Sequence, residues 1–211
     1  MTASNRYVSE FLQLKCAGDV LQCVGPMKKA DKEISESMAV IHRLRAITLA
    51  EPMRYGLVDL CCGNALASVT AVHLLPVKWA IAVDKRPRKM GRVPDRFERV
   101  KADIVKHPED VLVAIGFDRA REPFIVVSIH PCQGLADAVI EIYNDLGGAR
   151  HLIMMPCCVG PHVPLPAFMG VGRYREWCWR LYEKAHGKGN GVADENVMSP
   201  ANIVITKRKD G

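Results

Sequence analysis

Short apolar runs alternate with longer amphipathic stretches along the chain after residue 50. The runs are apolar along their whole length, which is typical of strands that are buried on both faces of a parallel sheet. We therefore expect strands within residues 55–62, 78–85, 98–104, 123–130, 150–158 and 201–209.

The stretches between these runs have the three- and four-residue spacing of apolar positions that predicts amphipathic helices. We expect helices within residues 67–75, 108–116, 134–146 and 173–186. Because strands and helices alternate, the pattern predicts an α/β fold with a mostly parallel sheet covered on both faces. We expect the last elements to pair antiparallel at one edge.

The residues before the first strand show only helical periodicity. One helix is expected near residues 7–14, and a second over residues 32–50, with Asp31 as its cap and Pro52 as its stop.

This change of pattern divides the chain into an N-terminal helical extension, residues 1–50, and an α/β domain, residues 51–211. Residues 186–200 are rich in glycine and polar side chains, so we expect a mobile loop there.

The composition is that of an ordinary globular protein, with 49% hydrophobic and 25% charged residues among 211. No apolar stretch is long enough to span a membrane and no secretion signal opens the chain, so no membrane partner is expected. The eight cysteines include two adjacent pairs, Cys61–Cys62 and Cys157–Cys158, inside apolar runs. Such placement is typical of buried thiols in a reducing compartment, and we expect an intracellular, cytoplasmic protein.

The stretch "VDLCCGNALAS", residues 58–68, joins the first expected strand to the next helix. Gly63 and Asn64 form a tight turn, and small residues follow it. Small residues at this place let a ligand approach the backbone and the helix N-terminus. Gly63 is the only glycine of the turn, so the dinucleotide-binding pattern G-x-G-x-x-G is absent, which argues against a nicotinamide or flavin enzyme.

Two acids end the next two expected strands. Asp84 follows Gly63 by 21 residues, at a place where a carboxylate can accept hydrogen bonds from both ribose hydroxyls of an adenosine. Asp103 ends the third strand, where an acid can accept a hydrogen bond from the adenine amino group. The alternative reading is that both acids are turn or cap residues. The order of glycine turn, acid and acid favours a nucleoside ligand.

This order resembles that of the class I S-adenosylmethionine-dependent methyltransferases. The resemblance implies a Rossmann-like fold with a mostly parallel seven-stranded sheet, S-adenosyl-L-methionine as the cofactor, and methyl transfer as the activity. It also implies a set of donor-binding residues, namely Asp59, Cys61, Gly63, Asn64, Asp84, Lys85, Asp103, Ile104 and Ser128.

Further stretches are similar to one branch of these enzymes, which includes the tRNA 2′-O-ribose methyltransferases of the acceptor stem and related methyltransferase-like proteins. They are "PMKKADKEI", "VDLCCGNALAS", "AVDKRP", "HPCQGLAD" and "MMPCCVGPH". The likeness extends over residues 26–162 and implies an RNA acceptor. Three features depart from that branch. "HPCQG" carries one inserted residue, residues 1–50 lack the zinc-binding Cys/His elements, and the region after His162 is not similar.

The stretch "SIHPC", residues 128–132, occupies the end of the fourth strand, which in class I enzymes faces the donor methyl group. A neutral imidazole can accept a proton from a hydroxyl or an amine, so we expect His130 to be the catalytic base, with Cys132 beside it in the catalytic site. The alternatives are a buried His130 that bonds a main-chain carbonyl and cysteines that are small core residues.

We expect no metal site. One built from His130, Cys132, Cys157, Cys158 and His162 is conceivable, but adjacent cysteines rarely both reach one tetrahedral ion, and the spacing fits no common zinc pattern. A cysteine that accepts the methyl group or attacks a base is a further alternative.

Two stretches carry the excess of positive charge, which amounts to +6 over the chain. Residues 85–92, "KRPRKMGR", hold five basic residues and no acid, and residues 173–180, "RYREWCWR", interleave arginines with aromatic residues. Both compositions suit contact with nucleic acid. The alternatives are a solvated face for the first and core packing for the second.

We therefore predict an S-adenosylmethionine-dependent methyltransferase whose acceptor is RNA, at a ribose hydroxyl or a base. The alternatives are a small-molecule methyltransferase and a catalytically inactive binding module that retains the fold. A small-molecule acceptor is favoured if both basic stretches lie away from the pocket mouth.

Overall fold

A seven-stranded sheet forms the centre of the molecule, whose computed structural model describes residues 5–159 and 170–210. The strand order is β3-β2-β1-β4-β5-β7-β6. Strands β1 to β5 run parallel, and β7 is antiparallel to both β5 and β6. The strands are β1 (Gly56–Leu60), β2 (Ala80–Asp84), β3 (Phe97–Lys101), β4 (Phe124–Ile129), β5 (Ala149–Met155), β6 (Lys188–Ala193) and β7 (Ile203–Arg208). This sheet confirms the predicted Rossmann-like α/β fold.

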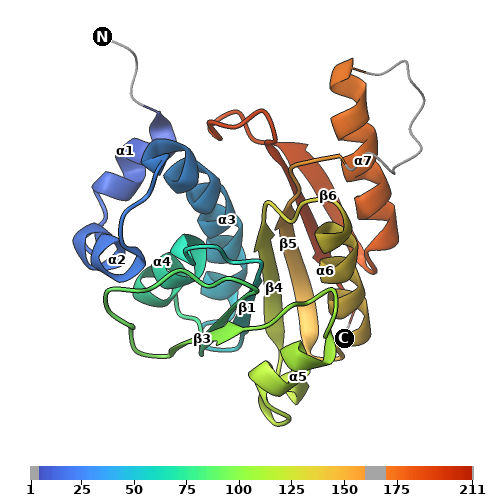
Figure 1. Cartoon of the computed structure of the whole chain (residues 1–211), viewed down its shortest axis with the longest axis horizontal. Helices are drawn as coiled ribbons and strands as arrows, with labels where there is room; N and C mark the ends of the chain where they lie inside the picture. Colours follow the sequence, from blue (N-terminus) through green and yellow to red (C-terminus); the bar gives the residue numbers. More distant parts are fainter. Residues whose placement is uncertain (1–4, 160–169, 211) are drawn as a thin grey trace.

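Helices cover both faces of the sheet (Figure 1). The seven α-helices of the described residues are α1 (Arg6–Leu12), α2 (Ala17–Val24), α3 (Ala30–Ala50), α4 (Leu66–Leu74), α5 (Glu109–Ile115), α6 (Gly134–Asp145) and α7 (Gly170–Lys184). Helices α1 to α4 pack on one face, and α5 to α7 pack on the other. No helix in the described part of the chain is both long and apolar enough to cross a membrane.

The apolar runs identified the central strands because successive residues of such a strand face opposite cores. In β1, Leu57 belongs to the core under α1 to α4, whereas Val58 and Leu60 belong to the core under α5 to α7. The edge strand β3 departs from this pattern, because Phe97 is its only buried residue. The expectation of strands that are apolar along their whole length therefore fails at this edge.

Strand β6, which the sequence analysis did not expect, lies within residues 186–200, where a mobile loop was predicted. Strand β6 pairs with β7 along its whole length, and all six of its residues are exposed. An exposed strand needs no apolar periodicity, so the pattern gave no sign of it. Its glycines have a packing role, since a Cβ on Gly189 would lie 1.8 Å from the carbonyl oxygen of Thr206.

The N-terminal helices share the core of the sheet face that they cover. Phe11 of α1 and Met38 and Leu44 of α3 are fully buried in the same cluster as Leu57. Helix α2 was not predicted. Helix α3 begins before the predicted cap, so Asp31 lies in its first turn, where a negative charge interacts favourably with the helix dipole. The division into two parts at residue 50 stays a prediction.

The connection from β2 to β3, residues 85–96, contains no helix and is held against α2. The backbone N–H of Gly91 donates to the carbonyl of Cys23 at 3.0 Å. A Cβ on Gly91 would lie 2.2 Å from the carbonyl oxygen of Gln22, so only glycine allows this approach. The basic run therefore has a fixed place beside the N-terminal helices.

Candidate functional site

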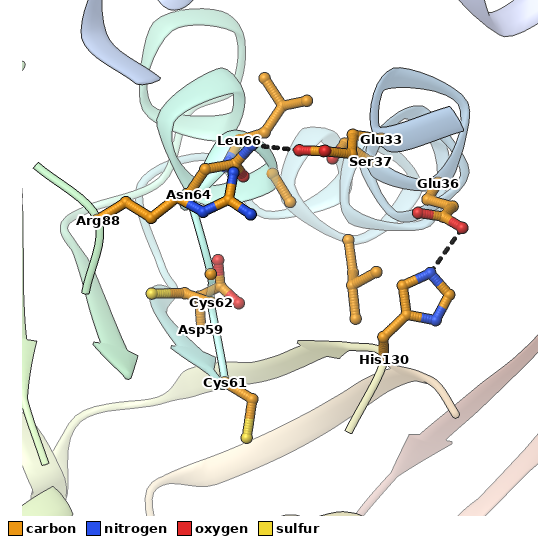
Figure 2. A pocket seen from close by; sticks show the side chains of 13 residues that line it. Glu33, Glu36, Ser37, Asp59, Cys61, Cys62, Asn64, Leu66, Arg88 and His130 are labelled. Atoms are coloured by element: carbon orange, nitrogen blue, oxygen red, sulfur yellow. Dashed lines mark hydrogen bonds and ion pairs between the residues drawn. The ribbon is translucent and has the colours of Figure 1, made fainter. Parts of the chain in front are cut away.

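A cavity of about 250 Å³ lies at the carboxyl ends of β1 and β4, where α3 passes over them (Figure 2). Parallel α/β sheets bind ligands at this edge. Its walls come from the loop after β1, the end of β4, the start of α4, the connection after β2 and helix α3. The lining residues are Glu33, Glu36, Ser37, Asp59, Cys61, Cys62, Gly63, Asn64, Leu66, Ala67, Arg88, Ile129 and His130.

The two loops at this cavity concentrate unusual backbone conformations. Six described non-glycine residues have a positive φ, and four of them belong to these loops: Cys61 and Ala65 after β1, and His130 and Gln133 after β4. A non-glycine residue in the left-handed region costs energy and persists where the surrounding structure enforces it, which happens most often at functional sites.

Asp84 holds the glycine turn against the end of β2. Its Oδ2 accepts a hydrogen bond from the Gly63 N–H at 2.9 Å, and its Oδ1 accepts one from the Arg86 N–H at 2.7 Å. The two oxygens of a carboxylate offer about four lone pairs, so two remain for a ligand. The predicted partners Gly63 and Asp84 are thus in direct contact.

Glu33 and Arg99, which the sequence analysis missed, brace the same turn, Glu33 through the expected residue Asn64. Asn64 donates from Nδ2 to Glu33 of α3 at 2.6 Å, and its Oδ1 accepts from the Leu66 N–H at the start of α4 (Figure 2). The Arg99 guanidinium, on β3, donates to the Gly63 carbonyl and also to the Arg88 carbonyl at 2.6 Å. Arg99 therefore fixes both the glycine turn and the basic run.

Asp59 is a buried acid beneath the cavity floor. Its side chain accepts a hydrogen bond from the Ser68 hydroxyl at 2.7 Å. Burial raises the pKa of the Asp59 carboxyl to about 7, because removal from water disfavours the charged form. The site thus contains a carboxyl group that ionises near neutral pH.

Replacement of Asp59 by asparagine is expected to stabilise the protein more at pH 8 than at pH 5. The unfolded carboxyl ionises near its ordinary pKa of 3.8 and the folded one near 7, so the native state alone holds the proton between these values. With respect to this group, the free energy of unfolding of the wild-type protein is highest below pH 4. It falls by up to about 4 kcal/mol as the pH rises through 7. Urea unfolding of both proteins at the two pH values measures the difference, and a gap independent of pH would contradict it.

A second cavity, of about 620 Å³, lies past Asp84 at the ends of β2 and β3. Asp103 lines it and pairs with Lys85 at 2.7 Å, and this lysine lowers the pKa of the Asp103 carboxyl. Asp103 also accepts the backbone N–H groups of Val105 and Lys106, as the alternative cap reading expected. Ile104 is buried in the core under α5.

His130 faces a buried acid that comes from the N-terminal extension. Its Nε2 lies 2.6 Å from Oε1 of Glu36, whose side chain is 4% exposed (Figure 2). The orientation is not that of a directed hydrogen bond, and neither atom has such a partner elsewhere. The nitrogen Nδ1 is also buried and unpartnered among the described residues. The alternative of a His130 ring bonded to a main-chain carbonyl is not what the structure has.

Of the other expected residues at the ends of β1 and β4, Cys61 lines the cavity, whereas Ser128 and Cys132 do not. Ser128 is buried and donates to the Leu60 carbonyl at 2.7 Å, which joins β4 to β1. Burial raises the pKa of the Cys61 thiol to about 12, so this thiol is neutral and a poor nucleophile. Cys132 lies outside the cavity lining, 3.6 Å from Cys158 between their sulfur atoms. His162 lies outside the described residues.

The two basic stretches have different surroundings. All five basic residues of the run at 85–92 are exposed, and Arg88 also lines the first cavity (Figure 2). In α7, Trp177 is buried in the core and the Tyr174 hydroxyl donates to the Pro156 carbonyl at 2.9 Å. Trp177 and Tyr174 therefore pack as the alternative reading expected, whereas Trp179 and the three arginines of this stretch are exposed.

Comparison with known proteins gives one family. Residues 28–160 match a sequence model that is described as a methyltransferase domain. No curated protein matches the chain by sequence.

Solved structures of low sequence identity are similar to this chain. The methyltransferase domain of bacterial CtHen1 has a TM-score of 0.50 and 14% identity, over 84% of this chain and 99% of that one. Protein 1320 of Thermoplasma acidophilum has a TM-score of 0.49 and 10% identity, over 99% and 98%. M. capricolum TrmK, solved with S-adenosylhomocysteine, has a TM-score of 0.45 and 11% identity, over 80% and 68%.

Proposed function

The chain belongs to the family of methyltransferase domains and is a class I S-adenosylmethionine-dependent enzyme, and from this premise we propose that its methyl acceptor is RNA. The observation that carries the proposal is Arg88, which belongs to an exposed basic run and also lines the cavity of His130. A phosphate backbone bound along this run would lie beside the reacting centre.

The residues present fit the donor. S-adenosylmethionine carries an ammonium and a sulfonium, and the first cavity offers the carboxylates of Glu33 and Glu36, the second of which also faces His130. The free lone pairs of Asp84 suit the ribose hydroxyls, and the second cavity, beside Asp103, suits the adenine. When bound, the donor supplies an electrophilic methyl group on its sulfonium.

The residues expected from the sequence all belong to the proposed donor site, but some contact the donor and others hold the surrounding loops in place. Gly63, Asp84 and Asp103 contact the donor, whereas Asp59, Asn64 and Ser128 hold the loops that form its walls. Cys61 lines the first cavity, Lys85 lines the second, and Ile104 packs beneath the second.

We propose that His130 removes the proton of the acceptor. Nε2 lies 2.6 Å from Oε1 of Glu36 without hydrogen-bond alignment, and a small rotation of the ring would let Nε2–H donate to Glu36 and leave Nδ1 as the proton acceptor. The Glu36 carboxylate then stabilises the imidazolium that forms. Glu36 thus acts as a positioning residue, and His130 is the group that touches the reacting atoms.

A labelled-methyl assay tests the acceptor. We expect label from S-adenosylmethionine to enter total RNA and to be released by ribonuclease but not by protease. Nucleoside analysis of the product then separates ribose from base methylation. Label that enters only small metabolites would overturn the RNA proposal.

Neutralising Lys89 and Arg92 together is expected to weaken RNA binding without altering the affinity for the donor. Each lost phosphate contact lowers the slope of log affinity against log salt by about 0.7 for a single strand, so the double variant should lose about 1 to 2 in slope. Filter binding at several salt concentrations measures it. The matched control neutralises Arg121 and Lys188, two exposed residues that lie before β4 and on β6. Equal slopes in the two variants would contradict the proposal.

A small-molecule acceptor is the second candidate, and the acidic wall of the first cavity favours it. Glu33 and Glu36 would suit a small amine as well as they suit the donor.

The eight cysteines are all free thiols, and a cytoplasmic location remains part of the proposal.

A further inference from the structure

Three thiols converge at the carboxyl ends of β4 and β5, beside the site and outside its cavity. Cys132 follows β4, and Cys157 and Cys158 follow β5. The sulfur of Cys158 lies 3.6 Å from that of Cys132 and 3.4 Å from that of Cys157, and all three sulfurs lie within 4.8 Å of one another. The adjacent cysteines therefore point to the same place, contrary to the usual behaviour that the sequence analysis assumed.

The surroundings of this trio are not those of core cysteines. Cys132 and Cys157 are half-buried and Cys158 is exposed. The thiols of Cys132 and Cys157 both direct their weak S–H donors at the carbonyl oxygen of His130, at 3.4 and 3.7 Å. Apolar packing thus does not explain why three sulfurs meet at a surface.

The spacing is that of a thiolate metal site. Zinc binds thiolate sulfur at about 2.3 Å, which places two sulfurs of a tetrahedral site about 3.8 Å apart. The separations of 3.6 Å and 3.4 Å from the Cys158 sulfur lie slightly below this value, and the third pair of sulfurs lies within 4.8 Å. An ion at the centre of the trio would replace three S–H groups by three metal–sulfur bonds, and it would leave a fourth position on the exposed side of Cys158 for solvent.

We propose that Cys132, Cys157 and Cys158 bind one Zn²⁺ ion. Binding releases the three thiol protons to the solvent, so affinity rises with pH.

Such an ion would fix the loop that carries His130. The backbone N–H of His130 donates to the Met155 carbonyl at 2.8 Å, and the residue has a left-handed φ of 59° directly before Pro131. A bond network from Cys132 through the metal to Cys157 and Cys158 would join the same two strand ends a second time. The ion would therefore support the conformation of the proposed base without contacting the acceptor.

Metal binding by the full-length protein tests this proposal independently of methyl transfer. Protein reduced and freed of metal is titrated with Zn²⁺ and, separately, with Co²⁺ as a spectroscopic probe. We expect one equivalent of Zn²⁺, a thiolate-to-cobalt charge-transfer band, the visible bands of a four-coordinate ion, and a Zn²⁺-dependent rise in Tm.

Cys158→Ser is the informative variant, because an exposed side chain puts little of the fold at risk. We expect its affinity for Zn²⁺ to fall at least about tenfold, since the loss of residues around metal ligands already costs about 10- to 100-fold. Cys16→Ser removes a half-buried thiol near α2 and should bind as wild type does. The proposal is overturned if wild type and Cys158→Ser bind equally, or if wild type binds no ion and forms a disulfide within the trio.

Discussion

Replacement of Asp84 by alanine is expected to weaken the binding of S-adenosylmethionine by at least about 100-fold. A hydrogen bond to a charged group contributes about 1.5–3 kcal/mol, and the variant loses two such bonds to the ribose hydroxyls. It also frees the Gly63 N–H, which Asp84 holds at 2.9 Å, so the glycine turn loses its fixed position. Both effects act in the same direction.

Isothermal calorimetry measures this loss directly. Asp118→Ala is the matched control, because this exposed acid lies on the connection that leads into β4, on the side of the strands' amino ends. Circular dichroism of both variants verifies that the fold is retained. An affinity in Asp84→Ala within about threefold of the control would remove Asp84 from the proposed donor site.

Replacement of His130 by glycine is expected to lower kcat by about 10²- to 10⁴-fold, the usual contribution of a general base. Glycine is preferred to alanine here because His130 has a φ of 59°, which glycine adopts without strain. The affinity for the donor should stay within about threefold, since the imidazole contacts the acceptor and Glu36 instead.

Two measurements separate a base from a structural histidine. Free imidazole should restore part of the lost activity, because the deleted side chain leaves room for it beside Glu36. Gln133→Gly is the matched control, since Gln133 has a φ of 53° in the same loop and does not line the cavity. If His130→Gly and Gln133→Gly have the same kcat, His130 is not the base.

The central strands and the contact between Gly63 and Asp84 could be predicted from the sequence. Runs that are apolar on both faces identify strands, and the carboxyl ends of neighbouring parallel strands must meet at one edge. Strand β6 could not be predicted, because it is exposed on both faces and leaves no periodic signal.

The pairing of His130 with Glu36 could not be predicted either, although both residues are visible in the sequence. Glu36 reads as one more charged position on an amphipathic helix, and only the packing of α3 across the ends of β1 and β4 buries it. The meeting of Cys157 with Cys158 has a similar cause. Side chains alternate in direction only while the backbone stays extended, and β5 ends at Met155, before these residues.

The placement of α3 makes the N-terminal helices part of the proposed methyl-transfer site. Glu33 and Glu36 form one wall of the cavity, and Arg43 of the same helix pairs at 2.5 Å with Asp194, which directly follows β6. A shortened chain that starts at β1 would lose this wall, the Glu33 contact that braces the glycine turn, and the helices that cover one face of the sheet. The helices that look like an appendage in the sequence therefore shield the proposed site from solvent on this side.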